Sequence, residues 1–120
     1  MRTYRLSAEA EDDIFDLLDY TEDRFGDIAR LRYEALLLTG LLDISANHER
    51  PGSVIRPELG QDVRTYHLRH SRDRVRGGTV RRPRHILLFR VSRPDLIGVG
   101  RVLHDAMEVE RHLPSQYGDG

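Results

Sequence analysis

The chain has 120 residues, no cysteine and a formal net charge of -1 at pH 7. This length is typical of one domain, and the absence of cysteine excludes disulfides, thiol chemistry and cysteine-based metal sites. No apolar run approaches the roughly 20 residues of a membrane helix, and the first residues lack the apolar stretch of a signal peptide. We therefore expect a soluble, cytoplasmic protein without a membrane partner.

The small net charge conceals a polarised chain. Residues 64–101 contain 11 arginines against two acids, whereas residues 9–27 contain nine acids against Arg24 alone. The chain contains arginine but no lysine. The planar guanidinium group of arginine binds carboxylates and phosphates equally well. The clustering favours an anionic partner for the second half of the chain, with a merely solvated arginine-rich segment as the alternative.

The first half of the chain has the pattern of a short strand followed by two helices. Residues 2–6 alternate as a strand does, and Ser7 is a suitable N-cap for the helix that follows. Gly26 can end this helix, and Asp27 can cap a second one. Helical spacing predicts a buried face of Ala10, Ile14, Leu17, Leu18, Thr21 and Phe25 in the first helix. Such a short connection favours an antiparallel αα-hairpin.

The second helix has more apolar residues than one face can hold. Its inner stripe is predicted to consist of Leu31, Ala35, Leu38 and Leu42. Together with these, Leu36, Leu37 and Leu41 cover more than one face. One face would pack on a sheet, and the other would lie under the loop at 48–61 or contact a partner protein.

The second half of the chain turns to β structure. Residues 63–70 alternate, and two continuous apolar runs at 86–89 and 96–103 predict strands that are covered on both faces. Gly98 and Gly100 within the last run indicate a close backbone approach or a bulge. The helical hairpin can cover only one face of the sheet, so the other would expose apolar surface to a partner. A short terminal helix is predicted after Asp105, followed by a flexible tail at 114–120.

Several segments, in this order and spacing, resemble the ParE toxins of the ParE/RelE toxin–antitoxin superfamily. The segments are Tyr4-Arg5-Leu6-Ser7-Ala8-Glu9, Leu17-Leu18-Asp19-Tyr20, Arg24-Phe25-Gly26, Arg50-Pro51-Gly52, Glu58-Leu59-Gly60, Val63-Arg64-Thr65-Tyr66-His67-Leu68 and Arg101-Val102-Leu103-His104. The resemblance implies an α+β domain over residues 1–113: an N-terminal strand, an αα-hairpin, a three-stranded antiparallel sheet and a short C-terminal helix. One departure is an arginine-rich insertion at 71–83, predicted to form a hairpin around Gly77-Gly78.

The resemblance also implies a function and two partners. ParE toxins are associated with inhibition of DNA gyrase and with neutralisation by a co-encoded ParD-like antitoxin, whose acidic amphipathic segment would enter an apolar groove flanked by cations. The expected antitoxin-binding residues are Arg64, Tyr66, Leu68, Arg69, Leu87, Phe89, Arg90 and Arg101. The expected target-binding residues, for gyrase or its DNA complex, are Arg74, Arg76, Arg81 and Arg82.

Two other functions fit parts of the sequence. A RelE-like, ribosome-dependent mRNA endonuclease would use Arg90, Arg101 and His104, but it lacks an evident second proton-transfer group. We therefore predict a non-enzymatic toxin in which His104 forms a structural hydrogen bond at the end of the last strand. A non-enzymatic nucleic-acid-binding module could use the arginine block, which has no aromatic residue between Ser71 and Arg84.

Catalytic and cofactor motifs are otherwise absent. His67 and His70 are three residues apart, which places them on opposite faces of a strand, and no HExxH spacing, P-loop or dinucleotide fingerprint occurs. The sequence therefore predicts neither a metal site nor a cofactor.

Overall fold

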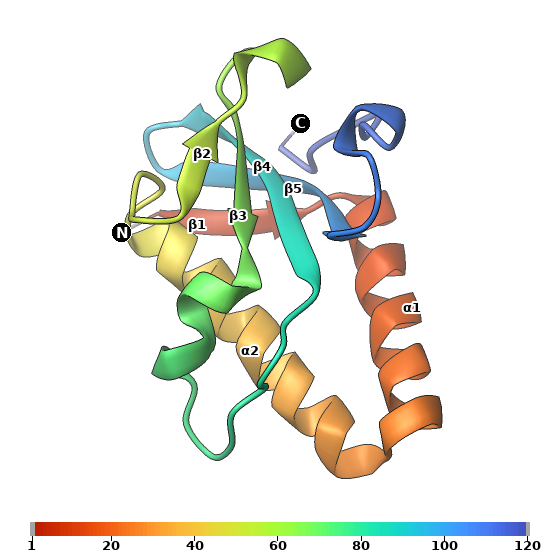
Figure 1. Cartoon of the computed structure of the whole chain (residues 1–120). Helices are drawn as coiled ribbons and strands as arrows, with labels where there is room; N and C mark the ends of the chain where they lie inside the picture. The colour runs from red at the N-terminus through yellow and green to blue at the C-terminus, as the bar shows by residue number, and fades with distance from the viewer. Residues whose placement is uncertain (1, 120) are drawn as a thin grey trace.

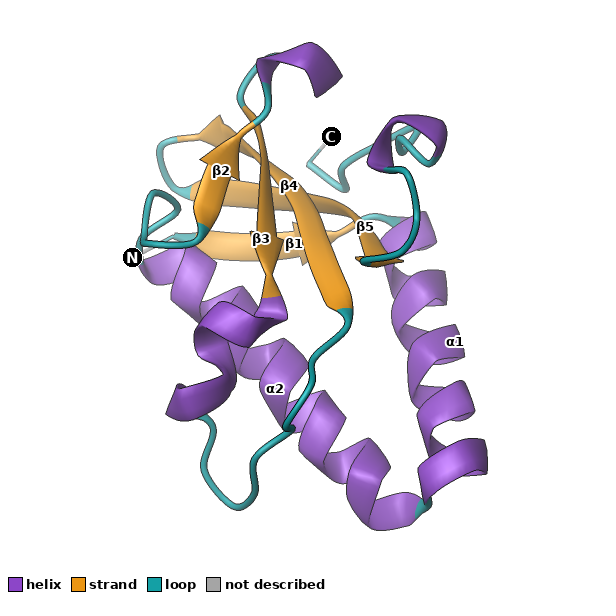
Figure 2. Ribbon diagram, in the orientation of Figure 1, coloured by secondary structure: helices purple, strands orange, loops and turns teal. Residues whose placement is uncertain are grey.

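The computed structural model describes residues 2–119. Two helices, α1 (Ala8–Phe25) and α2 (Asp27–Ala46), form a hairpin whose tip projects away from a mixed sheet (Figures 1 and 2). The strands are β1 (Thr3–Leu6), β2 (Ser53–Ile55), β3 (Val63–His67), β4 (His85–Arg93) and β5 (Leu96–His104). Their order is β1-β5-β4-β3-β2, with β1 parallel to β5 and the other pairs antiparallel. The predicted α+β class and the strand-then-hairpin order are confirmed, although β2 adds a strand that was not predicted.

Ser7 joins the start of α1 to the sheet. Its Oγ accepts a hydrogen bond from the backbone N–H of Ala10 (3.0 Å) and donates one to the carbonyl of Gly100 on β5 (2.7 Å). The predicted N-cap is therefore confirmed, and it also fixes where α1 begins relative to β5. At the other end, Gly26 adopts φ +93° between the two helices, a conformation that glycine adopts without strain.

The main core lies between the helical hairpin and one face of the sheet. Its helical side includes Ala10, Leu17, Leu18, Tyr33, Leu36, Leu37, Leu41 and Ile44, and its sheet side includes Tyr66, Leu87, Phe89, Ile97, Val99 and Val102. The predicted inner stripe of the second helix is wrong, because Leu31, Leu38 and Leu42 face solvent. Phe25, predicted to be buried, is 70% exposed at the tip of the hairpin. Helical spacing identified apolar faces here but not which of them meets the sheet.

The second face of the sheet is covered by the chain itself. Leu88, Leu103 and Val63 are buried there against Leu59, Val109 and Tyr117. Val109 belongs to a single 3-10 turn, Val109–Arg111, which stands where a short terminal helix was predicted. The expectation of an exposed apolar sheet face is therefore wrong.

The segment at 114–119, for which the sequence predicts a flexible tail, packs against β4 and β5, while residue 120 lies outside the described part. Asp119 pairs with Arg90 (2.7 Å) and accepts from the Ser92 hydroxyl. A Cβ on Gly98 would lie 2.6 Å from the carbonyl oxygen of Tyr117, and a Cβ on Gly100 would lie 2.4 Å from Pro114 Cγ. Of the two predicted alternatives, a close backbone approach is confirmed at Gly98, whereas Gly100 meets side chains of the tail and lies where the pairing of β4 with β5 shifts register.

Residues 71–83 contain no strand, so the predicted arginine-rich hairpin is wrong. The first part belongs to a 3-10 helix, Leu68–Arg74, and the rest is a loop that passes over α2 before β4 begins (Figure 1). Val75 and Val80 of this loop pack against the main core. The packing of these two apolar side chains fixes the loop against the core, although the surrounding arginines repel one another.

Candidate binding surfaces

An exposed apolar stripe runs along α2. We call it the α2 stripe: Ile28, Leu31, Leu38 and Leu42, which are 66%, 64%, 50% and 42% exposed. With half-buried Ala35 between them, these residues follow the alternating three- and four-residue spacing of a helix seam that packs against another helix. Their exposure shows that the loop at 48–61 does not cover them, so this alternative of the two is wrong. A row of exposed apolar residues is a candidate interaction surface.

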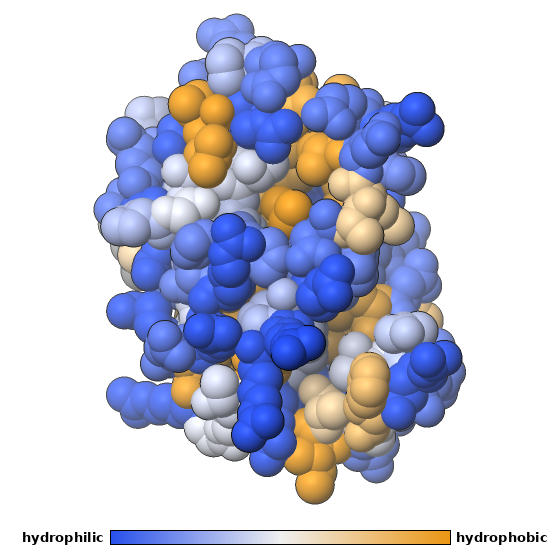
Figure 3. All heavy atoms as spheres, in the orientation of Figure 1, coloured by the Kyte–Doolittle hydropathy of each residue, from blue (hydrophilic) through white to orange (hydrophobic). Residues whose placement is uncertain are grey.

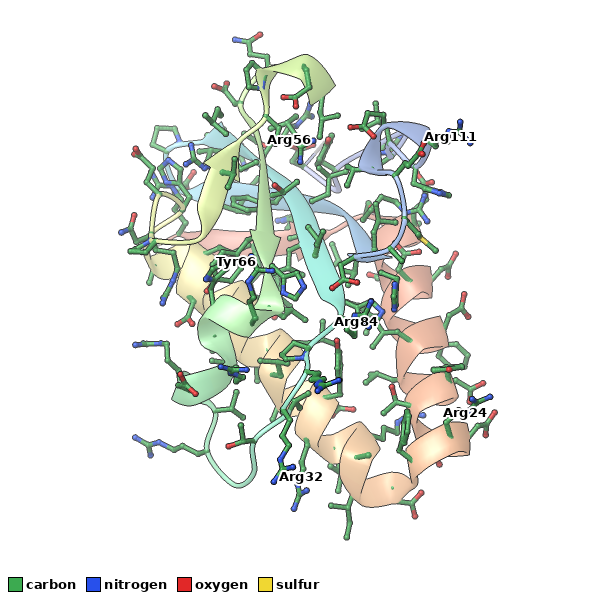
Figure 4. The ribbon with its side chains drawn as sticks, in the orientation of Figure 1. Arg24, Arg32, Arg56, Tyr66, Arg84 and Arg111 are labelled. Atoms are coloured by element: carbon green, nitrogen blue, oxygen red, sulfur yellow. The ribbon has the colours of Figure 1, made fainter. Side chains whose placement is uncertain are left out.

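A groove opens between the tip of the helical hairpin and the loop that precedes β4. We call it the basic groove. It has a volume of about 720 Å³ and is lined by Tyr20, Thr21, Phe25, Ala29, Arg32, Tyr33, Thr79, Val80, Arg81, Arg82, Arg84, His85 and His104. Figure 3 shows apolar and intermediate atoms gathered beside strongly hydrophilic ones on the lower part of this face. In Figure 4, Arg84 lies at the lower end of β4 and Arg32 further down on α2.

Tyr33 and His85 form a fixed pair on the inner side of the groove. The Tyr33 hydroxyl accepts from the backbone N–H of Arg84 (3.0 Å) and lies 2.6 Å from Nδ1 of His85. The hydroxyl thus joins the start of β4 to the His85 ring, and the tautomer of His85 sets which of the two groups donates. Burial raises the pKa of Tyr33 to about 12. Burial, with the nearby charge of His104, lowers the pKa of His85 to about 4.

Asp105 organises the neighbouring end of the sheet. It accepts from Nε of Arg84 (3.0 Å) and lies 2.9 Å from Nε2 of His67, so it links β3 to the segment before β4. The hydrogen bond from Arg84 lowers the pKa of Asp105 to about 2, with a smaller contribution from His67. His104 accepts from the backbone N–H of Ala106 through Nδ1 (3.0 Å), which is the hydrogen bond at the strand end that the sequence predicted.

The predicted antitoxin groove is not formed by the residues assigned to it. Tyr66, Leu68, Leu87 and Phe89 are completely buried in the main core, so they offer no surface in this structure. Tyr66, Leu87 and Phe89 point toward the helices because alternate residues of β3 and β4 face the hairpin, and Leu68 joins them as the first residue of the 3-10 helix. Sequence alternation grouped these side chains correctly, but it did not show that the chain covers them.

Two of the four arginines in the predicted antitoxin-binding set already form ion pairs within the chain. Arg90 is paired with Asp119 of the tail, which lowers the pKa of the Asp119 carboxyl. Arg101 is paired with Asp13 of α1 at 2.8 Å. Arg64 donates to the Ser53 hydroxyl at 2.8 Å, and Arg69 is exposed.

The residues of the endonuclease alternative are only partly brought together. Arg101 and His104 line one hollow beside α1. Arg90 lies elsewhere, in a hollow that includes Asp119 and Ser92. With Arg90 and Arg101 both bound to carboxylates, the three do not converge on one reacting phosphate.

The four predicted target-binding arginines separate into three environments. Arg81 and Arg82 line the basic groove, and Arg76 is exposed outside it. Arg74 donates to Asp43, a buried carboxylate that also accepts from the Ser71 hydroxyl (2.7 Å). Arg74 therefore anchors the 3-10 helix to α2, and only Arg81 and Arg82 of the set reach the groove.

Sequence reasoning missed the aromatic side of the groove. Tyr20 and Phe25 come from the last turns of α1, roughly sixty positions before Arg81 and Arg82 in the chain. One feature of the sequence could have indicated this exposed ring: Phe25 directly precedes Gly26, at the end of a helix, where a side chain is seldom buried. Among residues 2–119, no three His, Asp or Glu side chains are placed to hold a metal ion, and no helix has the length and apolar character to cross a membrane.

Comparison with known proteins identifies the family. A search of curated proteins gave no match. The family model described as the ParE toxin of the type II toxin-antitoxin system parDE matches residues 4–109, which include both helices, four strands and all of β1 except Thr3. The chain therefore belongs to the ParE toxin family.

Proposed function

We propose that this ParE-family toxin inhibits DNA gyrase in the cytoplasm and is kept inactive by a ParD-like antitoxin. The family match over residues 4–109 carries this proposal. The chemistry of the basic groove agrees with an inhibitor that acts by binding, because the pKa values of His85 and Tyr33 make both residues poorly suited to proton transfer. His85 is neutral at physiological pH, and Tyr33 keeps its proton.

The α2 stripe is the surface that we assign to the antitoxin. Its leucines are exposed in the toxin alone, and their spacing suits an amphipathic helix with apolar residues at matching positions. The family implies such a partner, whereas six of the eight residues first expected to bind it are buried or paired with a carboxylate. Antitoxin binding would thus bury apolar surface that the toxin alone leaves in water.

A double variant of the stripe tests this assignment. Leu31→Ser with Leu38→Ser should leave the fold intact, since both side chains are at least half exposed, and should weaken antitoxin binding at least tenfold, or roughly 1.4 kcal/mol. Val54→Ser on β2, also about half exposed at 53%, is the matched control. Titration calorimetry measures both. Equal affinity of the double variant and the parent would place the antitoxin elsewhere, and loss of self-association instead would assign the stripe to a second copy.

The gyrase target needs a separate experiment. Purified toxin should inhibit DNA supercoiling by gyrase, and cells that express it should show no toxin-specific mRNA cuts by primer extension. His104→Gln should keep growth inhibition at matched expression, because His104 forms a structural hydrogen bond with Ala106. If His104 were a general acid or base, this variant would lose roughly 10²–10⁴-fold of an RNA-cleavage rate. Specific mRNA cuts that disappear in His104→Gln would refute gyrase inhibition as the activity.

A further inference from the structure

We propose that the basic groove binds a single-stranded nucleic acid, with a base stacked on its aromatic wall and phosphates held by its arginines. The first observation is the aromatic wall itself. Tyr20 and Phe25 line the groove and are 56% and 70% exposed, although rings of this size are normally buried. Single-strand binding requires rings beside cations, because every base has a face that can stack. The fold brings these rings from α1 to an arginine segment that has none.

The second observation is the state of the arginines. Within residues 2–119, Arg32, Arg81 and Arg82 have no carboxylate partner within 4.0 Å, in contrast to Arg74, Arg84, Arg90 and Arg101, each of which has one. These three arginines line the basic groove together, whereas the other described arginines without a carboxylate partner lie outside it: Arg2, Arg5, Arg24, Arg64, Arg69, Arg76 and Arg93. No Asp or Glu is among the residues that line it. A groove with free guanidinium groups and no acid selects an anion.

The third observation is a neutral imidazole that lines the groove with the arginines. The Tyr33 hydroxyl is hydrogen-bonded to Nδ1 of His85 at 2.6 Å, which leaves Nε2 as the other ring nitrogen, and the low pKa keeps the ring neutral. His104 lies against it, with ring centroids 5.4 Å apart and planes at 84°. Imidazole N–H groups suit phosphate oxygens and the acceptor edges of bases alike. The groove thus offers stacking, charge and hydrogen-bond donation together.

The size of the groove favours a nucleotide strand over an acidic helix. Its volume of about 720 Å³ lies in the range of pockets that enclose one small ligand. A helix with side chains is about 10–12 Å across, so less than two turns would fill this space. Duplex bases are stacked on one another and cannot reach Tyr20 or Phe25 without leaving the helix. We therefore expect preference for single strands.

Fluorescence anisotropy tests the proposal with fluorescein-labelled oligo(dT) and oligo(U) twelve-mers and a mixed-sequence DNA duplex of equal length. The parent should bind both single strands more tightly than the duplex. Phe25→Ser should weaken single-strand binding roughly 5- to 150-fold, the effect of losing one stacked base. Phe15→Ser is the matched control, because Phe15 is 65% exposed on the same helix but does not line the groove. A preference for oligo(dT) would identify single-stranded DNA as the ligand of the groove, and a preference for oligo(U) would identify RNA.

The arginines are tested by salt dependence. Arg81→Gln with Arg82→Gln should reduce the slope of log affinity against log salt concentration by roughly 1.4, the value for two phosphate contacts to a single strand. Arg93→Gln with Arg111→Gln removes the same charge from exposed sites outside the groove and should change the slope little. Thermal unfolding of each variant confirms that it is folded. Equal losses in both double variants, or a duplex that binds as tightly as the single strands, would overturn the proposal. Failure of all oligonucleotides to bind at low salt would do the same, whether or not gyrase is inhibited.

Discussion

His85 makes the stability of this protein depend on pH in a direction that the structure fixes. Burial lowers its pKa from 6.5 to about 4. The folded state therefore binds this proton less readily than the unfolded state does. Its contribution to stability is fully present above pH 6.5 and is lost as the pH falls toward 4. The full difference corresponds to about 3 kcal/mol, of which about 2 kcal/mol is lost by pH 5.

Urea unfolding at pH 7.5 and pH 5 measures this loss, and His85→Asn isolates it. The amide oxygen of Asn can take the place of Nδ1 and accept from the Tyr33 hydroxyl, so the variant keeps that hydrogen bond without a titrating ring. Burial also lowers the pKa values of His48 and His70, and their effect is common to both proteins. Asp105, with a pKa of about 2, remains ionised throughout this window.

We expect the parent to lose about 2 kcal/mol more than His85→Asn between the two pH values. Equal losses would show that His85 is hydrated in the folded state and that its pKa is ordinary. A parent that gains stability at pH 5 would refute the sign, and with it the burial of a neutral His85 in the folded state.

Three further predictions concern the tail, the buried carboxylate and the partner. Gly100→Ala should cost roughly 1–3 kcal/mol of stability and speed hydrogen exchange across 114–119, because its Cβ would meet Pro114 at 2.4 Å. Asp43→Ala should lower the free energy of unfolding by roughly 1.5–3 kcal/mol, and Arg74→Gln by less than about 1 kcal/mol, since Arg74 is 60% exposed; urea titration compares them. Antitoxin at about 100 times its Kd should stabilise the toxin by about 2.7 kcal/mol, seen as a higher thermal midpoint, and an unchanged midpoint would contradict a partner that binds only the folded toxin.

Local signals in the sequence were sufficient for much of the fold. Ser7 has the residue type and position of an N-cap, and its hydroxyl accepts from Ala10. Gly98 and Gly100 indicated a close backbone approach or a bulge, and the tail packs against both glycines, with a register shift at Gly100. The N-cap depends only on residues close to it in the sequence. The two glycines are needed because any side chain at these positions would collide with the tail. The order of strand, hairpin and sheet follows from the same kind of local pattern.

The faces of α2 could not be assigned from sequence. Two apolar stripes lie on this helix, and helical spacing gives no reason for the sheet to meet Leu37 and Leu41 and not Leu38 and Leu42. The choice depends on how α1, the sheet and the 3-10 helix fit together. The pairing of Arg90 with Asp119 is similarly non-local, because 29 positions separate the two residues. Side chains that looked available to a partner were therefore already engaged within the chain.

The side of α2 that is left exposed also determines whether the α2 stripe and the basic groove can be occupied at the same time. Leu31 of the α2 stripe and Arg32 of the basic groove are consecutive residues, about 100° apart around the helix. A partner helix about 10 Å across that is seated on the stripe would extend over the α2 wall of the groove. Antitoxin and oligonucleotide should therefore compete, and unlabelled antitoxin should release a fluorescent oligonucleotide from the toxin at matched occupancy. If both bind at once with unchanged affinities, the stripe or the groove has been assigned to the wrong partner, and the Leu31→Ser/Leu38→Ser and Phe25→Ser variants identify which.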